Sequence, residues 1–439
     1  MYNWHITPLR GDIMGKTLEV AVVGCGSRGR AYAKFALEEP GKMMITAVAE
    51  PIEYRRTMTG DMFSVPEENR FASCEEFIAS GIRVDAVINA TMDKDHYSTA
   101  VMILNAGFDM LIEKPVCLTK DELTELYKLS MDKERKVMVC HVLRYAPFYL
   151  EIKKRILAGE IGKVTSMVTE ENVSFHHYST AFCRGKWGNS DVCGSHMMMS
   201  KCCHDLDIIT WMKNDSRPEY VSSMGGLFNF IKKNFPEGAG EKCTVDCNIS
   251  NTCEFDAKKM YFNCETWGYY VRECLDDYDD RDSNERLLKS IGKDNPYGKC
   301  VWKCDNNVVD HQTVLIEFED GCTVSHNLLG ATAKPERTIH IVGTKGEIYG
   351  EMESKTFYIR KPDMTKAPYY IEETIVIDVE TDGHGGGDSR LAADFASYIS
   401  GGETTISTTA LGDSIYGHLI GFNAHEAMTK RKVVKIERL

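Results

Sequence analysis

No run of apolar residues in this 439-residue chain approaches the roughly 20 that a helix needs to cross a bilayer. The first residues, 1–16, lack the continuous apolar core of a secretory signal, so we expect a short leader, with Met14 as an alternative start. Positive charge is also in deficit, because 65 acidic residues against 52 basic ones give a net charge of −13. These absences argue against a membrane or a nucleic acid as partner and predict a cytoplasmic protein.

The length suits two domains rather than one core. Hydrophobic residues make up 43% of the chain and charged residues 27%, which is typical of a soluble globular protein. The 16 cysteines are scattered along the sequence. Because disulfide frameworks belong to small secreted domains, we interpret most of these cysteines as free thiols.

Between residues 17 and 145, short apolar segments alternate with helical patterns. The expected strands are residues 18–23, 45–49, 86–89, 110–112 and 137–141. The expected helices include residues 29–38, 96–105 and 120–133. This alternation predicts βαβ units and a parallel sheet covered by helices on both faces.

The pattern changes after residue 145. The expected strands are residues 163–172, 312–318, 323–328, 338–343, 347–351 and 356–360. The expected helices are residues 150–158, 204–212, 388–400 and 410–428. Alternating strands joined by tight turns predict a large, mainly antiparallel open sheet, so residues 146–439 form an α+β domain. Residues 230–310, rich in Asp, Asn, Lys and Cys, are interpreted as an insertion.

The segment Gly24-Cys25-Gly26-Ser27-Arg28-Gly29 connects the first strand directly to a helix. In this context G-x-G-x-x-G binds a dinucleotide, because its glycines allow a tight turn and a close approach of the pyrophosphate. Glu50 ends the second strand, where an acid binds the ribose hydroxyls of NAD and repels the extra phosphate of NADP. Arg55 and Arg56 lie close enough to blur this preference. Residues 17–145 are therefore predicted to form an α/β Rossmann domain that binds NAD in preference to NADP.

The strand at 110–112 ends in Glu113-Lys114-Pro115. Ligands of a doubly wound sheet bind at the carboxyl ends of its strands, so Lys114 is expected to point toward the nicotinamide. Taken alone, a lysine after a strand is more often a solvated surface residue. The position therefore leaves a functional and a surface role open.

Seven segments together resemble the Gfo/Idh/MocA family of oxidoreductases. They are AVVGCGSRG, EKPVCLT, HVLRYAPFY, ILAGEIGKV, SKCCHDLDIITW, TIHIVGTKGEIYG and HGGGDSRLAADF. The resemblance runs from about residue 17 to 428 and leaves out the insertion. It implies a nicotinamide-dependent oxidoreductase that acts on a sugar or a sugar derivative.

The resemblance places Lys114 beside the reacting carbinol and brings His204, at a helix start in the second domain, next to it. Hydride leaves a carbinol carbon only as the hydroxyl proton is removed, so a base must contact that oxygen. His204 suits the base and Lys114 suits stabilisation of the negative charge. A helix-capping or core histidine is the alternative. The family often carries Asp four residues before this histidine, where this chain has Ser200. The division of labour therefore stays open, and Lys201 becomes a candidate substrate ligand.

The loop at 174–195 combines aromatic rings with hydrogen-bonding groups, which suits a sugar, although an ordinary packed loop is the alternative. The predicted substrate site comprises Tyr145, His176, Tyr178, Arg184, Trp187, Lys201 and His204. The predicted cofactor site comprises Gly24, Cys25, Gly26, Ser27, Arg28, Gly29, Glu50, Arg55, Ala90, Thr91, His96, Glu113, Lys114 and Arg144.

The cysteines of the insertion are treated separately. Their spacing, C-x3-C-x5-C from Cys243, differs from a zinc ribbon, which has two C-x2-C pairs. Four thiolates drawn from Cys243, Cys247, Cys253 and Cys300 or Cys304 nevertheless suit a structural zinc ion. Free thiols are the alternative.

Three functions fit these observations. The first is NAD-dependent hydride transfer at a carbinol of a sugar, cyclitol or glycoside. The second is an NAD-dependent glycoside hydrolase that uses transient oxidation, elimination, hydration and re-reduction; retention of Lys114 disfavours it, because such relatives typically replace this lysine. The third is a sugar-sensing protein without turnover. The open sheet also predicts a homodimer or homotetramer, because relatives cover its outer face with a second subunit.

Overall fold

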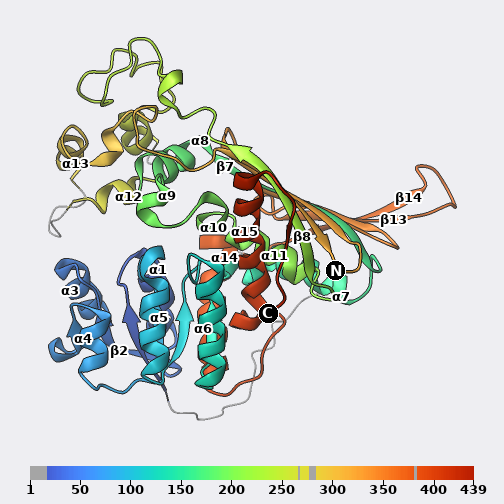
Figure 1. Ribbon diagram of the computed structural model, residues 1–439, viewed down its shortest axis with the longest axis horizontal. Helices are drawn as coiled ribbons and strands as arrows, with labels where there is room; N and C mark the ends of the chain where they lie inside the picture. Colours follow the sequence, from blue (N-terminus) through green and yellow to red (C-terminus); the bar gives the residue numbers. More distant parts are fainter. Residues whose placement is uncertain (1–16, 265–266, 276–282, 380–382) are drawn as a thin grey trace.

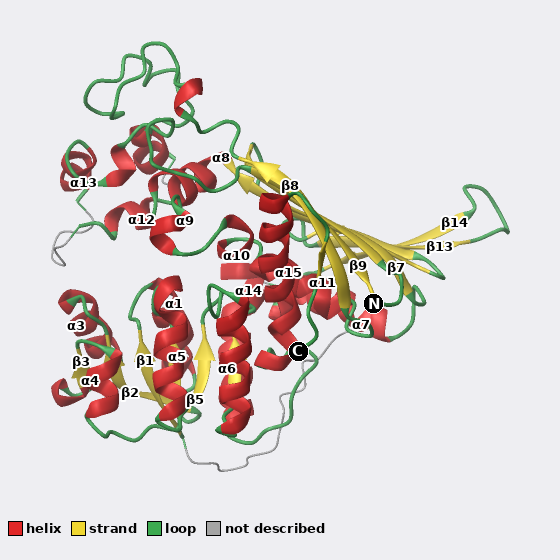
Figure 2. Cartoon of the chain, viewed as in Figure 1, coloured by secondary structure: helices red, strands yellow, loops and turns green. Residues whose placement is uncertain are grey.

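The computed structural model describes residues 17–264, 267–275, 283–379 and 383–439, so the expected leader lies outside the described residues. The described chain builds two sheets with helices packed between and around them (Figures 1 and 2). Within these ranges no helix is both long enough and apolar enough to cross a membrane.

The first sheet is parallel, with the strand order β3-β2-β1-β4-β5-β6. Its strands are β1 (Leu18–Val23), β2 (Met43–Ala49), β3 (Arg70–Phe71), β4 (Ala86–Asn89), β5 (Asp109–Ile112) and β6 (Val137–Val139). Its helices are α1 (Ser27–Ala33), α2 (Phe35–Glu38), α3 (Glu53–Met62), α4 (Cys74–Ala79), α5 (His96–Asn105) and α6 (Lys120–Asp132). The Rossmann prediction is therefore confirmed. The helix expected at 29–38 begins earlier, at Ser27, and is interrupted at Lys34.

The second sheet has the order β14-β13-β12-β11-β7-β10-β9-β8-β15. Its strands are β7 (Val164–Ser174), β8 (Pro218–Gly226), β9 (His311–Phe318), β10 (Thr323–Thr332), β11 (Glu336–Gly343), β12 (Glu347–Glu351), β13 (Thr356–Pro362), β14 (Tyr370–Val376) and β15 (Val434–Lys435). It is mainly antiparallel, as expected, but β10 runs parallel to β7. Residues along β9 alternate strictly between exposed and buried, so one face of the sheet packs on the core and the other is open.

Helices cover the buried face of the second sheet. They are α7 (Pro147–Leu157), α11 (Cys203–Met212) and α15 (Leu411–Lys430). The segment between β7 and α11 forms short helices: α8 (Phe175–His177), a π-helix (Tyr178–Arg184), α9 (Ser190–Cys193) and α10 (Met197–Ser200). Residues 174–195 are thus more ordered than the loop expected from the sequence.

The insertion lies between β8 and β9 in the chain. It carries helices absent from the sequence prediction, a π-helix (Lys259–Asn263), α12 (Gly268–Arg272) and α13 (Asn284–Ile291). Its buried residues form a separate apolar cluster that includes Tyr261, Val271 and Leu287. The segment therefore has a small core of its own.

Helix α14 (Gly383–Ile399) packs against the first sheet. Although it lies late in the chain, its Leu391 and Phe395 are fully buried in one cluster with Val22 and Ile88 of the first sheet. An apolar face of α14 therefore covers the first sheet.

Candidate active site

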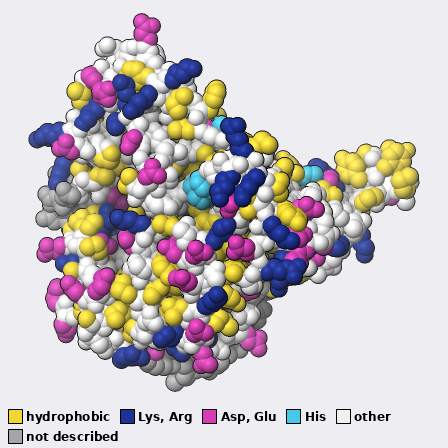
Figure 3. Space-filling model, in the orientation of Figure 1, with side chains coloured by type: hydrophobic (Ala, Val, Ile, Leu, Met, Phe, Trp, Pro, Cys, Tyr) yellow, Lys and Arg dark blue, Asp and Glu magenta, His cyan; other side chains and the backbone are white. Residues whose placement is uncertain are grey.

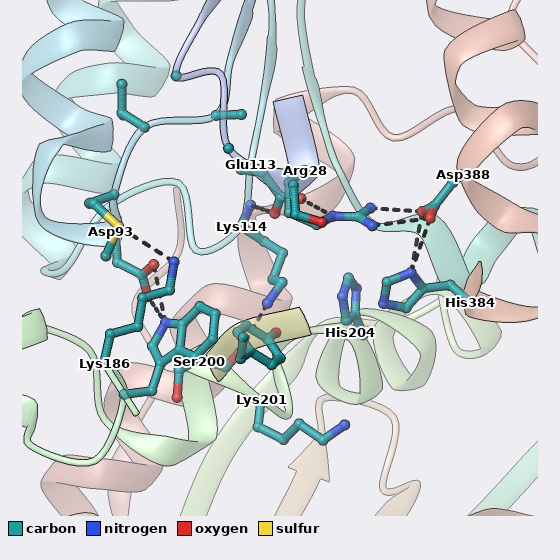
Figure 4. Close-up of a pocket in the computed structure, with 18 of the residues that line it drawn as sticks. Arg28, Asp93, Glu113, Lys114, Lys186, Ser200, Lys201, His204, His384 and Asp388 are labelled. Carbon is teal, nitrogen blue, oxygen red and sulfur yellow. Dashed lines mark hydrogen bonds and ion pairs between the residues drawn. The ribbon is translucent and has the colours of Figure 1, made fainter. Parts of the chain in front are cut away.

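A cavity of about 1130 Å³ lies where the carboxyl ends of the first sheet meet the second domain. The first domain lines it with the glycine-rich turn, the ends of β2 and β4, and the segment after β5. The second domain contributes residues from β7, α10, α11, the insertion and the start of α14. Figure 4 shows the contributions of Ser200, His204 and His384. The position agrees with the general rule for ligand sites in doubly wound sheets.

The three glycines of the glycine-rich turn have different surroundings: two are tightly packed and one borders open space. Gly24 has a φ of 91°, and a Cβ there would lie 2.3 Å from the carbonyl oxygen of Ala90. A Cβ at Gly29 would lie 2.1 Å from the carbonyl oxygen of Gly24. At Gly26, by contrast, a Cβ would meet nothing within 4 Å, and the residue lines the cavity. Gly26 therefore leaves open the space that a pyrophosphate needs beside the backbone.

Glu50 is held at the end of β2 by two backbone amides. Its Oε2 accepts from the N–H of Cys25 at 2.8 Å and its Oε1 from the N–H of Ile52 at 3.1 Å. Arg55 also lines the cavity, whereas Arg56 turns back to the carbonyl oxygen of Glu50 at 2.6 Å. The turn and the acid together fit a dinucleotide, with Glu50 placed for the ribose hydroxyls and Arg55 as the neighbouring cation.

Lys114 crosses from the first domain to the second. Its Nζ donates to the backbone carbonyl of Ser200 at 3.0 Å (Figure 4). Ser200 is the position where the family often has Asp, so here a peptide oxygen holds the ammonium group. Glu113, which directly precedes Lys114 in the chain, is buried. It accepts hydrogen bonds from Arg28 Nε at 2.9 Å and from the hydroxyl of Tyr32 at 2.7 Å. Glu113 thus orients the segment that carries Lys114.

His204 lies in the first turn of α11 and lines the same cavity, with 5% of its surface exposed. Burial, together with the nearby Lys114 ammonium and the His384 ring, holds the pKa of His204 well below its ordinary value. Its Nδ1 has no hydrogen-bond partner among the described residues. At neutral pH His204 is therefore an uncharged imidazole that can accept a proton.

Lys201 lines the cavity but points away from Lys114 (Figure 4). Its Nζ pairs with Oε1 of Glu171 at 3.1 Å. Glu171 also pairs with Arg337, which in turn donates to Asp205 at 3.0 Å. Lys201 thus belongs to a network of charges in one wall of the cavity.

Aromatic rings form another wall. Trp267, from the insertion, stacks on His177 with 3.9 Å between ring centroids. Tyr270 of α12 meets Trp187 edge-on at 6.0 Å, and Trp187 Nε1 donates to Asp93 at 3.3 Å. All five residues line the cavity. The insertion therefore reaches the site, which its composition did not indicate.

Several predicted site residues lie outside the cavity lining. From the predicted cofactor site these are Cys25, Gly29 and Arg144, and from the predicted substrate site they are Tyr145, His176, Tyr178 and Arg184. The other members of both predicted sets line it: Gly24, Gly26, Ser27, Arg28, Glu50, Arg55, Ala90, Thr91, His96, Glu113, Lys114, Trp187, Lys201 and His204.

Arg144 and Arg184 both bind partners within the protein. Arg144, 3% exposed, donates to the carboxylate of Asp207 through Nε at 2.7 Å and through Nη2 at 2.5 Å. Arg184 donates to the carbonyl oxygens of Lys299 and Phe255, each at 2.6 Å. Both guanidinium groups are occupied by the protein itself, so Arg144 joins two elements and Arg184 anchors the insertion.

The three other predicted substrate ligands also have internal partners. The hydroxyl of Tyr145 donates to Asp394 at 2.7 Å, and that of Tyr178 donates to the carbonyl oxygen of Val309 at 3.1 Å. Nδ1 of His176 lies 3.0 Å from Nε1 of Trp267, which donates to it. His176 therefore positions an aromatic ring of the wall from outside the cavity.

Sequence reasoning missed His384 and Asp388. Both line the cavity at the start of α14, and Nδ1 of His384 lies 3.3 Å from Asp388. Arg28 of the glycine-rich turn donates to the Asp388 carboxylate at 2.7 and 3.0 Å. The string HGGGD was a usable signal, because a glycine run beside His and Asp marks special backbone geometry.

The structure does not support zinc in the insertion. Among the described residues, two groups have three potential ligand atoms within 4.8 Å of one another, His141 with Cys203 and His418, and Cys202 with Asp205 and His326. None of Cys243, Cys247, Cys253, Cys300 and Cys304 belongs to either group. The apolar cluster around Tyr261 supplies the core for which zinc had been suggested.

Comparison with known proteins adds to this geometry. Residues 18–141 match the Gfo/Idh/MocA family model, described as an oxidoreductase family with an NAD-binding Rossmann fold. The chain is 25% identical over 403 residues to the oxidoreductase YteT of Bacillus subtilis, covering 85% of this chain and 87% of YteT. It is 25% identical over 204 residues to inositol 2-dehydrogenase of Corynebacterium glutamicum, covering 45% of this chain and 55% of that relative. The structure of levoglucosan dehydrogenase with NADH and levoglucosan has the same fold, with a TM-score of 0.69 at 17% identity over 96% of this chain and 100% of that one.

Proposed function

We propose that this chain, whose residues 18–141 match the Gfo/Idh/MocA family model, is a member of that family and transfers a hydride between the nicotinamide and a carbinol of a sugar, cyclitol or glycoside. One observation carries the proposal. Lys114 and His204 come from different domains, and both line the cavity that also contains Gly26 and Glu50. A candidate proton acceptor and a cation thus share one space with the cofactor cradle.

NAD, when bound, supplies the acceptor or donor of the hydride. The chain's residues would bind and orient NAD: Gly26 would let the backbone approach the pyrophosphate, and Glu50 would accept hydrogen bonds from the ribose hydroxyls. A carboxylate at Glu50 disfavours the extra phosphate of NADP. This arrangement supports NAD as the preferred cofactor.

The substrate hydroxyl lies between Lys114 and His204 in this proposal. His204 takes the hydroxyl proton, since its lowered pKa keeps the imidazole uncharged at neutral pH. The Lys114 ammonium, which the carbonyl oxygen of Ser200 directs, stabilises the negative charge that develops on the substrate oxygen. In the reverse direction the same two groups return the proton to the carbonyl oxygen.

The cavity walls favour a sugar or cyclitol. Trp187 and Trp267 offer apolar faces to C–H groups, and Lys201 and Glu171 offer hydrogen-bond partners to hydroxyls. The names of two relatives, inositol 2-dehydrogenase and levoglucosan dehydrogenase, point to the same substrate class.

The test is to measure NADH formation by absorbance with the purified protein and a panel of sugars, cyclitols and glycosides. We expect net NADH formation with at least one class. Release of the aglycone without net NADH would instead establish the glycoside hydrolase. Sugar binding without any turnover would establish a sensor and contradict the dehydrogenase.

A further inference from the structure

His384 enters the cavity from a constrained backbone. His384, Gly385 and Gly386 are consecutively left-handed, with φ values of 53°, 66° and 78°. A residue with a side chain rarely adopts this conformation, which persists only where surrounding contacts impose it. The backbone that follows His384 packs closely against Val142, because a Cβ at Gly387 would lie 2.2 Å from the carbonyl oxygen of Val142. The fold therefore determines where the imidazole of His384 sits.

A chain of charged groups then orients that imidazole. Nδ1 of His384 donates to Asp388, since an ionised carboxylate only accepts. Burial acts to raise the pKa of Asp388, but the hydrogen bonds from His384 and Arg28 outweigh it and hold the pKa well below its usual range. Arg28 also donates to Glu113, next to Lys114. With Nδ1 donating, Nε2 of His384 is left as a proton acceptor.

His384 adds another imidazole to the cavity lining, which also contains His177 and His204. Burial lowers its pKa and outweighs the hydrogen bond to Asp388, which acts to raise it. The ring centroids of His384 and His204 are 5.8 Å apart. His204 stands between Lys114 and His384 (Figure 4). Hydride transfer at a carbinol needs one base for the hydroxyl proton, so the proposed reaction leaves His384 without a step.

We propose that His384 is a second acid–base group, which moves the proton on the carbon next to the substrate carbonyl. The inference rests on the proposed function, because that carbonyl is the oxidised form of the carbinol held by Lys114 and His204. The site then catalyses enolisation in addition to hydride transfer.

The enolisation step balances without an oxidant or reductant. The C–H bond beside the carbonyl breaks, and its proton forms an N–H bond at Nε2 of His384. The electron pair of the C–H bond becomes the C=C bond of an enolate, whose oxygen takes the negative charge beside the Lys114 ammonium. The reverse step returns a proton from Nε2 to the same carbon. In D₂O the carbon therefore gains deuterium.

The test is deuterium exchange, followed by NMR, with two ketones, 2-keto-myo-inositol and methyl 3-keto-β-D-glucopyranoside. The full-length protein is loaded with oxidised NAD, so no hydride is available and exchange is separated from reduction. We expect exchange at least about 10²-fold faster than in buffer. His384→Asn should lower this rate by about 10²-fold or more, and Asn is chosen because it tolerates the left-handed backbone. His384→Gln is the second variant.

The matched control is His311→Ala. His311 also pairs with an aspartate, Asp310 at 2.8 Å, but it lies outside the cavity, so exchange should match the parent. Absence of exchange with both ketones, or exchange that survives in both His384 variants, overturns the inference. NADH formation from the corresponding alcohols is recorded separately. If no NADH forms while deuterium exchange persists, the proposed hydride transfer is contradicted. The exchange result still supports proton transfer by His384.

Discussion

Lys114 and His204 are the side chains on which the proposed hydride transfer depends. Lys114→Ala removes the cation beside the reacting oxygen, and His204→Ala removes the base. Each should lower kcat by about 10²–10⁴-fold, the usual contribution of positioned acid–base groups. NAD affinity, measured by fluorescence titration, should change little, because Gly26 and Glu50 carry that contact. If His204→Ala keeps near-parent turnover while Lys201→Ala has lost turnover, Lys201 rather than His204 is the base that removes the hydroxyl proton.

The pH dependence follows from the same imidazole. Protonation removes the base, so activity is lost on the acid side of the His204 pKa. That pKa lies well below the ordinary value of 6.5, so kcat/KM should stay level as pH falls to 6.5 and should decline only below it. A pH profile of kcat/KM checks this, because it reports the pKa of the free enzyme. A half-loss of activity above pH 6.5 contradicts the assignment.

Glu50 makes a prediction about cofactor choice. Its carboxylate would face the extra phosphate of NADP, so kcat/KM should favour NAD by at least about tenfold, or about 1.4 kcal/mol. Glu50→Ala should lower the ratio of kcat/KM for NAD to kcat/KM for NADP, because Arg55 then remains as a cation beside the ribose. Equal efficiency of the two cofactors with the parent protein would refute the role of Glu50.

At the scale of elements, Arg184 fastens the insertion to the π-helix before α9. Its guanidinium satisfies the partly buried carbonyl oxygens of Lys299 and Phe255. Arg184→Ala leaves both acceptors unpaired, which should cost about 2–5 kcal/mol. Protease cleavage within residues 243–304 should accelerate, and KM for the sugar should rise because Trp267 and Tyr270 lose their support.

Arg438→Ala is the control for Arg184→Ala. Arg438 pairs with Glu319 at the surface and its side chain is 72% exposed, so this substitution should change stability by less than about 0.5 kcal/mol. If both variants resist proteolysis equally, Arg184 is not the anchor of the insertion.

For the whole molecule, the open face of the nine-stranded sheet predicts self-association. Leu315, Val168 and Tyr349 lie on one row across β9, β7 and β12, and they are 53%, 41% and 41% exposed. Apolar side chains also gather at the tip of the β13–β14 hairpin, which projects from the molecule (Figure 3). Such surface is typical of protein contacts, so we expect a homodimer or homotetramer.

Light scattering at micromolar concentration measures this state directly. Val168→Glu should shift the mass toward that of a monomer, because it places a charge in the centre of the row. Met44→Glu, at a 47% exposed residue of β2 in the other domain, should leave the mass unchanged. A parent protein that is monomeric would contradict the prediction.

The sequence by itself determined the features whose causes are local. The apolar strands, the turn with its φ of 91° at Gly24, and Glu50 at the end of β2 each depend on residues next to one another, so spacing alone revealed them. Lys114 after β5 was placed by the rule for parallel sheets, since the carboxyl ends of such strands meet at one edge. The open antiparallel sheet followed from period-two alternation.

Only the tertiary structure decided which charges face the cavity. Arg28 and Asp388 form a hydrogen bond although 360 positions separate them in the sequence, and 63 positions separate the bonded pair Arg144 and Asp207. No periodic pattern in the sequence links two side chains over such separations. Arg184 was expected at the sugar and instead holds the insertion. A polar side chain becomes a ligand or an anchor according to what is buried around it, because a buried donor or acceptor must be satisfied by whichever partner folding brings within reach.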